Sequence, residues 1–169
     1  MAIEQLGAAE LTRLRDMIDR AEIDEVHNDY FHAMDTRNFD LLSRVFAPDA
    51  IFTASLIGHA KVTARGFDDV RATIRNVAMY RTSHHRTCNR SIILNGNEAS
   101  AVVVARDALL DTAPRLADAV VGCRLVQHGL RYTDQLVRTS HGWRIRERDL
   151  VCLWQQVTVN PPYMDPLPF

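Results

Sequence analysis

The hydrophobic pattern of this chain changes from helical to strand-like near residue 80. Before this point, apolar residues recur with the spacing of amphipathic helices. After it come four long stretches rich in Val, Ile, Leu and aromatic residues, separated by turn-forming residues. Helices followed by long strands predict an α+β domain in which the helices cover one face of a sheet.

The expected elements follow from this pattern and from its interruptions. We expect helices over 9–19, 21–36 and 66–80, with a short helix that Asn38 caps and that runs through Phe46. We expect strands over 50–54, 82–94, 99–110, 119–139 and 143–154. Strands this long twist and curl, so the helices would close the open side and leave a cone with an apolar interior, which suits a ligand.

Length and charge limit the classes of function. The 169 residues fit one domain covering 1–169, with an N-terminal helix within 1–19 and a C-terminal tail over 157–169. The formal net charge of −1 gives no electrostatic reason to expect nucleic acid or an anionic membrane as a partner. No apolar run has the length of a membrane span, and no signal-peptide core precedes the first helix, so we expect a cytoplasmic location.

The tail and the cysteines each carry a further expectation. Four prolines in the tail argue against a helix or a continued strand, yet its apolar residues favour packing over a pocket mouth or onto a neighbouring subunit. Cys88, Cys123 and Cys152 share no metal-binding spacing and are expected to be reduced, buried thiols. Glycine-rich phosphate loops, serine-hydrolase elbows and metal-ligand clusters are absent from the sequence, so we expect chemistry without a cofactor or a metal.

Asp35 is the strongest candidate for a functional residue, because it ends its helix one helical step after Phe31 and beside Met34, next to the apolar face of that helix. A carboxylate there can cap local backbone, meet an arginine or hold a histidine. In the strand over 82–94, period-two alternation puts His85 and Ser83 on one face and His84 on the other. His85 is therefore the best partner for Asp35, although a lone strand histidine is also compatible with a purely structural role.

Two further residues are candidates with open alternatives. Asp107 interrupts an apolar strand, so it is either a buried acid that needs a partner or a surface acid paired with Arg106 or another neighbour. Tyr30 has core spacing and lies five residues before Asp35, about 140° around an ideal helix. The charged residues of the last two strands are expected to be solvated or paired across the sheet, namely Arg131, Asp134, Arg146 and Arg148.

A set of short motifs in a fixed order resembles the SnoaL-like domains of the nuclear transport factor two-like superfamily. They are Tyr-Phe-His-Ala-Met-Asp at 30–35, Phe-Ala-Pro-Asp-Ala at 46–50, Ser-His-His at 83–85, Gly-Asn-Glu-Ala at 96–99, Tyr-Thr-Asp at 132–134 and Gly-Trp-Arg-Ile at 142–145. The similarity covers nearly the whole chain. It implies a cone-shaped α+β roll, with a curved mixed or antiparallel sheet wrapped around N-terminal helices.

The resemblance also implies an activity. Scytalone dehydratase, bile-acid dehydratase and hexachlorocyclohexane dehydrochlorinase are close enzymatic members, and they eliminate without a cofactor by means of a His-Asp pair. That pair carries over onto His85 and Asp35, and the bile-acid dehydratase pattern adds Tyr30 and Asp107. We therefore expect a lyase, meaning a dehydratase or a related elimination enzyme, or an isomerase, acting on a hydrophobic cyclic small molecule.

The same resemblance leaves alternatives open. The fold also serves polyketide cyclases and non-catalytic accessory subunits, such as the small subunits of ring-hydroxylating dioxygenases. Related dehydratases are trimers whereas other branches of the fold are dimers, so we expect a homo-oligomer and favour a trimer.

Overall fold

The computed structural model describes residues 7–112 and 123–159. Its first element is a single long helix, α1 (Ala8–Thr36). The break that we expected near residue 20 is absent, because Arg20 is a good helix former and no glycine or proline interrupts this part of the chain. The 3₁₀ turn η2 (Phe39–Leu41) and the short helix α2 (Leu42–Val45) follow, and Asn38 precedes them without a capping hydrogen bond from its side chain.

The remaining helical segment matches the expected range 66–80 within one residue at each end, but its second part is a 3₁₀ helix. It consists of α3 (Phe67–Ile74) and the 3₁₀ turn η3 (Arg75–Met79). Six strands complete the fold: β1 (Phe46–Ser55), β2 (Val62–Arg65), β3 (Thr82–Asn95), β4 (Glu98–Thr112), β5 (Cys123–Thr139) and β6 (Gly142–Val159). Of these, only β2 is not anticipated by the sequence pattern.

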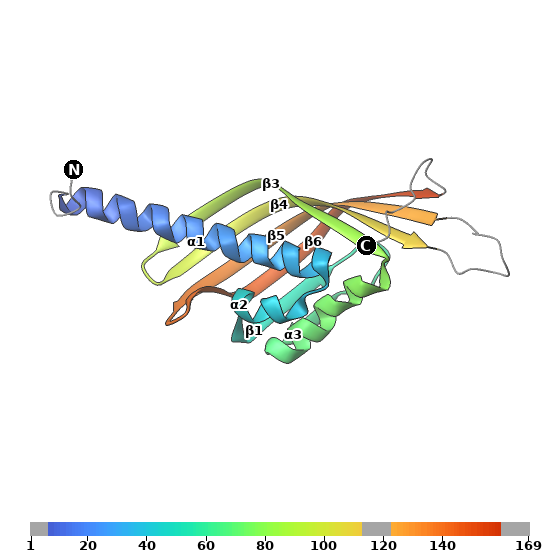
Figure 1. Cartoon of the computed structure of the whole chain (residues 1–169), viewed down its shortest axis with the longest axis horizontal. Helices are drawn as coiled ribbons and strands as arrows, with labels where there is room; N and C mark the ends of the chain where they lie inside the picture. The colour runs from blue at the N-terminus through green and yellow to red at the C-terminus, as the bar shows by residue number, and fades with distance from the viewer. Residues whose placement is uncertain (1–6, 113–122, 160–169) are drawn as a thin grey trace.

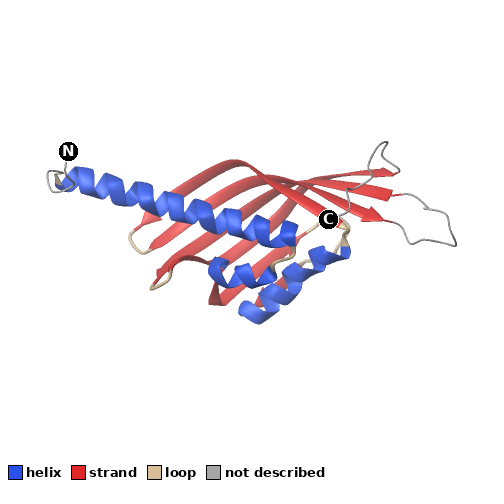
Figure 2. Ribbon diagram, in the orientation of Figure 1, coloured by secondary structure: helices blue, strands red, loops and turns tan. Residues whose placement is uncertain are grey.

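The six strands form one sheet in the order β2-β1-β6-β5-β4-β3. Strand β1 pairs parallel to β6, and all other neighbours are antiparallel. The sheet is strongly curved, and α1, α2 and α3 lie along its inner side (Figures 1 and 2). This mixed, curved sheet with N-terminal helices confirms the predicted α+β roll.

The end of β6 corrects the expected boundary of the C-terminal tail. Val157 and Val159 belong to the strand and pair with Val126 and Arg124 of β5. These β-branched residues favour a strand, and the first proline of the tail comes only at position 161. The rest of the tail lies outside the described residues, so its packing over a pocket or a neighbouring subunit stays a prediction.

The core lies between α1 and the concave face of the sheet. Its largest fully buried side chains include Tyr30 of α1, Tyr132 of β5 and Trp143 of β6. Cys152 is buried as expected, but Cys88 is exposed because it is the extra residue where the register of β3 against β4 shifts. The side chain of Cys123 lies outside the described part. No helix within 7–112 or 123–159 is long and apolar enough to cross a membrane.

Candidate active site

The end of α1 is tied to the sheet by Arg37. This residue ends the helix in the left-handed conformation, with φ of 60°. Its guanidinium donates hydrogen bonds to the carbonyl oxygen of Met34, to the carbonyl oxygen of Tyr80 at 3.0 Å and to the hydroxyl of Ser83 at 2.6 Å. Arg37 therefore fixes the position of the last helical turn, which carries Asp35, against the start of β3.

Asp35 receives three hydrogen bonds from β3. The hydroxyl of Ser83 donates to Oδ1 at 2.9 Å, and the backbone N–H of His85 donates to Oδ2 at 2.8 Å. The ring nitrogen Nδ1 of His85 lies 2.6 Å from Oδ1. Partial burial raises the pKa of Asp35. The hydrogen bonds and charge of His85, together with the hydrogen bond from Ser83, lower this pKa by a larger amount, so that the net shift is downward. Asp35 is therefore an ionised acceptor that orients His85.

His85 is held on two sides and points into the curved sheet. Its side chain is 4% exposed, and its ring stacks on Phe31 with 5.6 Å between ring centroids. The neighbouring His84 is exposed, in agreement with the alternation predicted for this strand. With Nδ1 on Asp35, the second nitrogen Nε2 is left for chemistry, and it lies 3.9 Å from Oδ2 of Asp107.

Asp107 is buried, so the inward-facing alternative is the correct one for this residue. It lies opposite His85 in the β3–β4 register and opposite His128 in the β4–β5 register. The backbone N–H of His128 donates to Oδ1 at 3.0 Å, and Nδ1 of His128 lies 2.8 Å from the same oxygen. Three neighbouring strands therefore place His85, Asp107 and His128 in one row.

Tyr30 belongs to an adjacent cluster rather than to this row. Its side chain is buried, and burial raises the pKa of its hydroxyl. The guanidinium of Arg148 lies 4.1 Å from the centroid of its ring. The ring of Phe31, which stacks on His85, is 5.4 Å from the ring of Tyr30. One aromatic ring therefore separates Tyr30 from the His85 imidazole.

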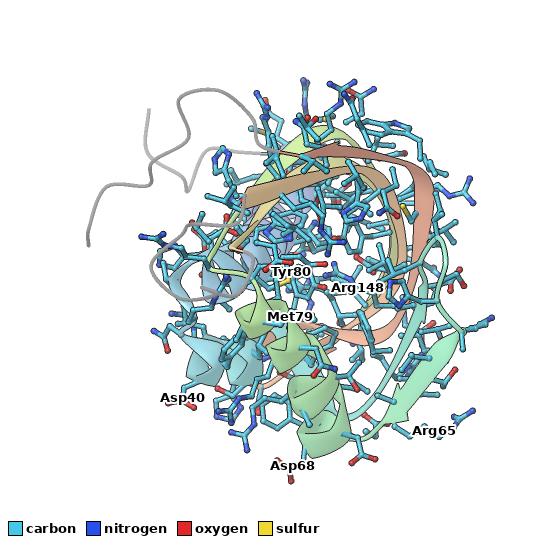
Figure 3. The ribbon with its side chains drawn as sticks, turned by 90° about the vertical axis from the view of Figure 1, so that its right-hand side faces the viewer. Asp40, Arg65, Asp68, Met79, Tyr80 and Arg148 are labelled. Atoms are coloured by element: carbon cyan, nitrogen blue, oxygen red, sulfur yellow. The ribbon has the colours of Figure 1, made fainter. Side chains whose placement is uncertain are left out.

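The adjacent cluster contains a buried charge pair. Arg148 donates from Nε and Nη2 to the two carboxylate oxygens of Asp134, at 2.8 and 2.7 Å. Nε2 of His27 lies 2.9 Å from Oδ2 of the same carboxylate. Figure 3 shows Arg148 inside the curve of the sheet, whereas Asp40 and Asp68 lie at the periphery of the molecule. The expected pairing across the sheet is correct for Asp134 and Arg148, but both are buried rather than solvated.

Sequence reasoning missed three contributors to the site. His128, Ser83 and Arg37 had no assigned function, although each holds or supports one of the predicted acids. The register of β4 against β5 brings His128 to Asp107, and the left-handed end of α1 aims Arg37 at β3. An inward-facing histidine on a late strand is a usable signal, but its partner depends on a register that the sequence does not specify.

The described residues contain no group of three His, Cys, Asp or Glu side chains arranged to hold a metal ion. Chemistry without a cofactor or metal stays a prediction. The arrangement that is present, a buried imidazole with one nitrogen on a carboxylate, is suited to accepting a proton at its other nitrogen.

Comparison with known proteins assigns the family. The model of the SnoaL-like domain matches residues 15–149 of this chain. The chain belongs to the SnoaL-like family. The uncharacterized protein Rv2910c from Mycobacterium tuberculosis is 33% identical to this chain over 135 residues, which cover 77% of this chain and 82% of that protein.

Solved structures agree with this assignment. The Kfla4162 protein from Kribbella flavida is 25% identical, with a TM-score of 0.68 over 83% of this SnoaL-like chain and 95% of that one. The hexachlorocyclohexane dehydrochlorinase LinA, type 2, has a TM-score of 0.72 over 92% of this chain and 99% of its own, at 18% identity. The likeness to LinA is one of fold. Both confirm the cone-shaped roll predicted from the sequence motifs.

Proposed function

We propose that this SnoaL-like protein is a cofactor-independent lyase, catalysing a dehydration or a related elimination, or an isomerase, and that it acts on a hydrophobic cyclic small molecule. The observation that carries the proposal is the contact of 2.6 Å between Nδ1 of His85 and Oδ1 of Asp35. Solved structures of similar fold include a putative scytalone dehydratase and a hexachlorocyclohexane dehydrochlorinase, which supports this type of reaction.

His85 would act as the general base. When Nδ1 carries its hydrogen toward Asp35, Nε2 has a free lone pair that can accept a proton from an acidic C–H group. The imidazolium that forms is stabilised by the carboxylate of Asp35, which also fixes the tautomer and the orientation of the ring. Proton transfer of this kind contributes about 10²- to 10⁴-fold to the rate.

Asp107 and Tyr30 would assist at other atoms of the substrate. Asp107 lies close to Nε2 of His85, so it would act on the leaving group beside the carbon that loses the proton. Tyr30 is packed among Phe31, Tyr132 and Arg148, so we propose that it polarises a substrate oxygen that reaches this cluster. The aromatic rings beside His85 favour an apolar, ring-shaped substrate.

The test uses simple cyclic ketones as probes. We expect the protein to accelerate exchange of the α-hydrogens of a cyclohexanone for deuterium, or the conversion of a 3-hydroxycyclohexanone to the enone. His85→Ala and Asp35→Asn should each lower kcat/KM by about 10³-fold or more, because the first removes the base and the second favours the wrong tautomer.

The matched control is His84→Ala, since His84 is the adjacent residue on the same strand and is exposed. It should retain the activity of the unmodified protein. If Asp35→Asn and His85→Ala turn over the same probes at the unmodified rate, the dyad is not the catalytic device. Co-purification with a larger oxygenase chain, together with the absence of any turnover, would favour an accessory subunit instead.

We also propose that the protein is a cytoplasmic homotrimer. The trimer is supported by the frequent oligomerisation of the superfamily and by exposed apolar side chains on the sheet, among them Ile93, Val102 and Leu153. Sedimentation equilibrium at micromolar concentration would decide the question, and a monomer there would exclude the trimer.

A further inference from the structure

The structure contains two histidine–aspartate pairs in which the carboxylate contacts both the backbone N–H and Nδ1 of its histidine. In the first, Asp35 accepts the backbone N–H of His85 at 2.8 Å and contacts its Nδ1 at 2.6 Å. In the second, Asp107 accepts the backbone N–H of His128 at 3.0 Å and contacts its Nδ1 at 2.8 Å. Each aspartate therefore fixes its histidine through two contacts and leaves Nε2 of that histidine uncontacted by the same carboxylate.

The two pairs are adjacent. Oδ2 of Asp107 lies 3.9 Å from Nε2 of His85, and Oδ1 of the same carboxylate holds His128. The side chains of His85 and Asp107 are 4% and 5% exposed, and that of His128 is 11% exposed. Among the described residues, no side chain or backbone group is hydrogen-bonded to Nε2 of His128. Two imidazoles with available Nε2 atoms therefore flank one buried carboxylate.

We propose that His128 is a second catalytic histidine, which delivers a proton from Nε2 to the leaving oxygen of the substrate. This inference rests on the proposed function, because it supplies the general acid that complements the base His85. It also changes the part taken by Asp107. Oδ1 of Asp107 already accepts the backbone N–H and faces Nδ1 of His128, so Asp107 acts as the holder of the acid.

The proton balance of the step is complete. Nε2 of His85 takes the proton from the carbon beside the carbonyl, and the C–H electron pair forms the new C=C bond. The C–O bond breaks with its electron pair on oxygen, which takes the proton from Nε2 of His128 and leaves as water. His85 ends as imidazolium and His128 as neutral imidazole. The net charge of the site is unchanged, and the resting state returns when His85 releases one proton and His128 takes up another.

Two probes with different leaving groups test the assignment. 3-Hydroxycyclohexanone needs a proton on its leaving oxygen, whereas 3-(4-nitrophenoxy)cyclohexanone releases a stable phenolate without one. We expect His128→Gln to lower kcat/KM for the hydroxy ketone by about 100-fold or more, the low end of general-acid contributions. The nitrophenoxy ketone should lose less than about fivefold. An equal loss on both probes would overturn the role of His128.

The variant His128→Asn separates proton donation from positioning. An asparagine side chain places an N–H group close to the position of Nδ1, so it can keep the hydrogen bond to Asp107 while it removes Nε2. If His128 is the acid, His128→Asn should be as slow as His128→Gln on the hydroxy ketone. Recovery of activity in His128→Asn would show that His128 only positions Asp107, and would refute the proposal.

Failure of the proposed function is recognised separately. His85→Ala should be slow with both probes, because both need the C–H proton removed. If His85→Ala matches the unmodified protein on both, or if the unmodified protein eliminates neither, the proposed function falls and this inference falls with it. If His85→Ala is slow with both probes as expected, but His128→Gln loses kcat/KM equally on both, the role of His128 as the acid falls and the proposed function stands.

Discussion

Asp134 and Arg148 face each other across β5 and β6 and form a two-point ion pair whose side chains are 0% and 1% exposed. The guanidinium of Arg148 also lies 4.1 Å from the ring centroid of Tyr30 and 4.8 Å from that of Tyr132. Burial raises the pKa of Asp134, but the charge and the hydrogen bonds of Arg148 lower this pKa by a larger amount. The pair is therefore ionised inside the core.

Arg148→Met should destabilise the protein strongly. Removing the cation leaves the carboxylate of Asp134 buried with only His27 beside it, and breaking a buried pair in this way costs about 3–5 kcal/mol. Arg148→Lys should also be destabilising, because an ammonium group can neither form the two-point contact nor stack on the two tyrosine rings. Urea unfolding monitored by tryptophan fluorescence would measure both losses.

The double variant Arg148→Met with Asp134→Leu is the control for this explanation. It leaves no unpaired charge in the core, so it should be more stable than Arg148→Met alone, even though His27 loses its acceptor. A double variant that is no more stable than the single one would show that packing around the guanidinium, rather than charge compensation, dominates the loss.

Stability should fall on acidification in two separate pH windows. Burial lowers the pKa of His27 from its ordinary 6.5, against the opposing effect of Asp134. The unfolded chain therefore binds a proton at His27 that the folded protein does not, and folding stability decreases as the pH falls below about 6.5. The neutral form also agrees with the structure, since Nδ1 of His27 is buried without a partner and a proton there would be unpaired.

The second window comes from the carboxylates. The net pKa shifts of Asp35 and Asp134 are downward from 3.8, so their stabilising interactions persist at neutral pH and are lost as the pH falls below about 4. Urea unfolding at intervals from pH 8 to pH 3 would resolve both windows. His27→Gln should remove the dependence that begins below about pH 6.5 and keep the carboxylate window, whereas an unchanged upper window would assign it to another group.

The sequence contained enough information for the fold and for the first contact of the site. Apolar periodicity distinguished the helices from the strands, and the alternation along 82–94 selected His85 over His84. The pairing of Asp35 with His85 was accessible because a helix end and a strand start can be placed from local pattern together with the family motifs.

The rest of the site depends on long-range geometry. Asp107 meets His128, and Asp134 meets Arg148, only when the registers of three long strands are known. Those registers contain shifts at Gly129/Leu130 and Gln135/Leu136 that no turn motif in the sequence specifies. A carboxylate in an apolar strand could therefore be recognised as unusual, but its partner could not be named.

Ser83→Ala should weaken catalysis without unfolding the protein. The Ser83 hydroxyl accepts from Arg37 at 2.6 Å and donates to Asp35 at 2.9 Å, so it connects the helix end to the acid of the dyad. Loss of one hydrogen bond to a charged group costs about 1.5–3 kcal/mol, which corresponds to roughly a 10- to 150-fold fall in kcat/KM if the whole loss appears in the transition state. The cyclic ketone probes would measure it.

Ser91→Ala is the matched control, because Ser91 lies on the same strand and is exposed. It should leave kcat/KM unchanged. If Ser83→Ala is equally unaffected, the two contacts of His85 are sufficient to hold Asp35, and the link through Ser83 has no catalytic effect.

Gly129→Ala should be destabilising because of a single neighbour. A Cβ atom at this position would lie 2.1 Å from Nε1 of Trp154, the residue opposite it on β6, so the indole would have to move. That movement would also break the contact of the indole with Arg106, whose guanidinium lies 5.2 Å from the ring. Overpacking of this kind costs about 1–3 kcal/mol.

In a Trp154→Ala background the indole is absent, so Gly129→Ala should then cost much less. Urea unfolding of the four proteins in this double-mutant cycle measures the difference. An equal cost in both backgrounds would show that the backbone at Gly129, rather than the indole above it, excludes a side chain.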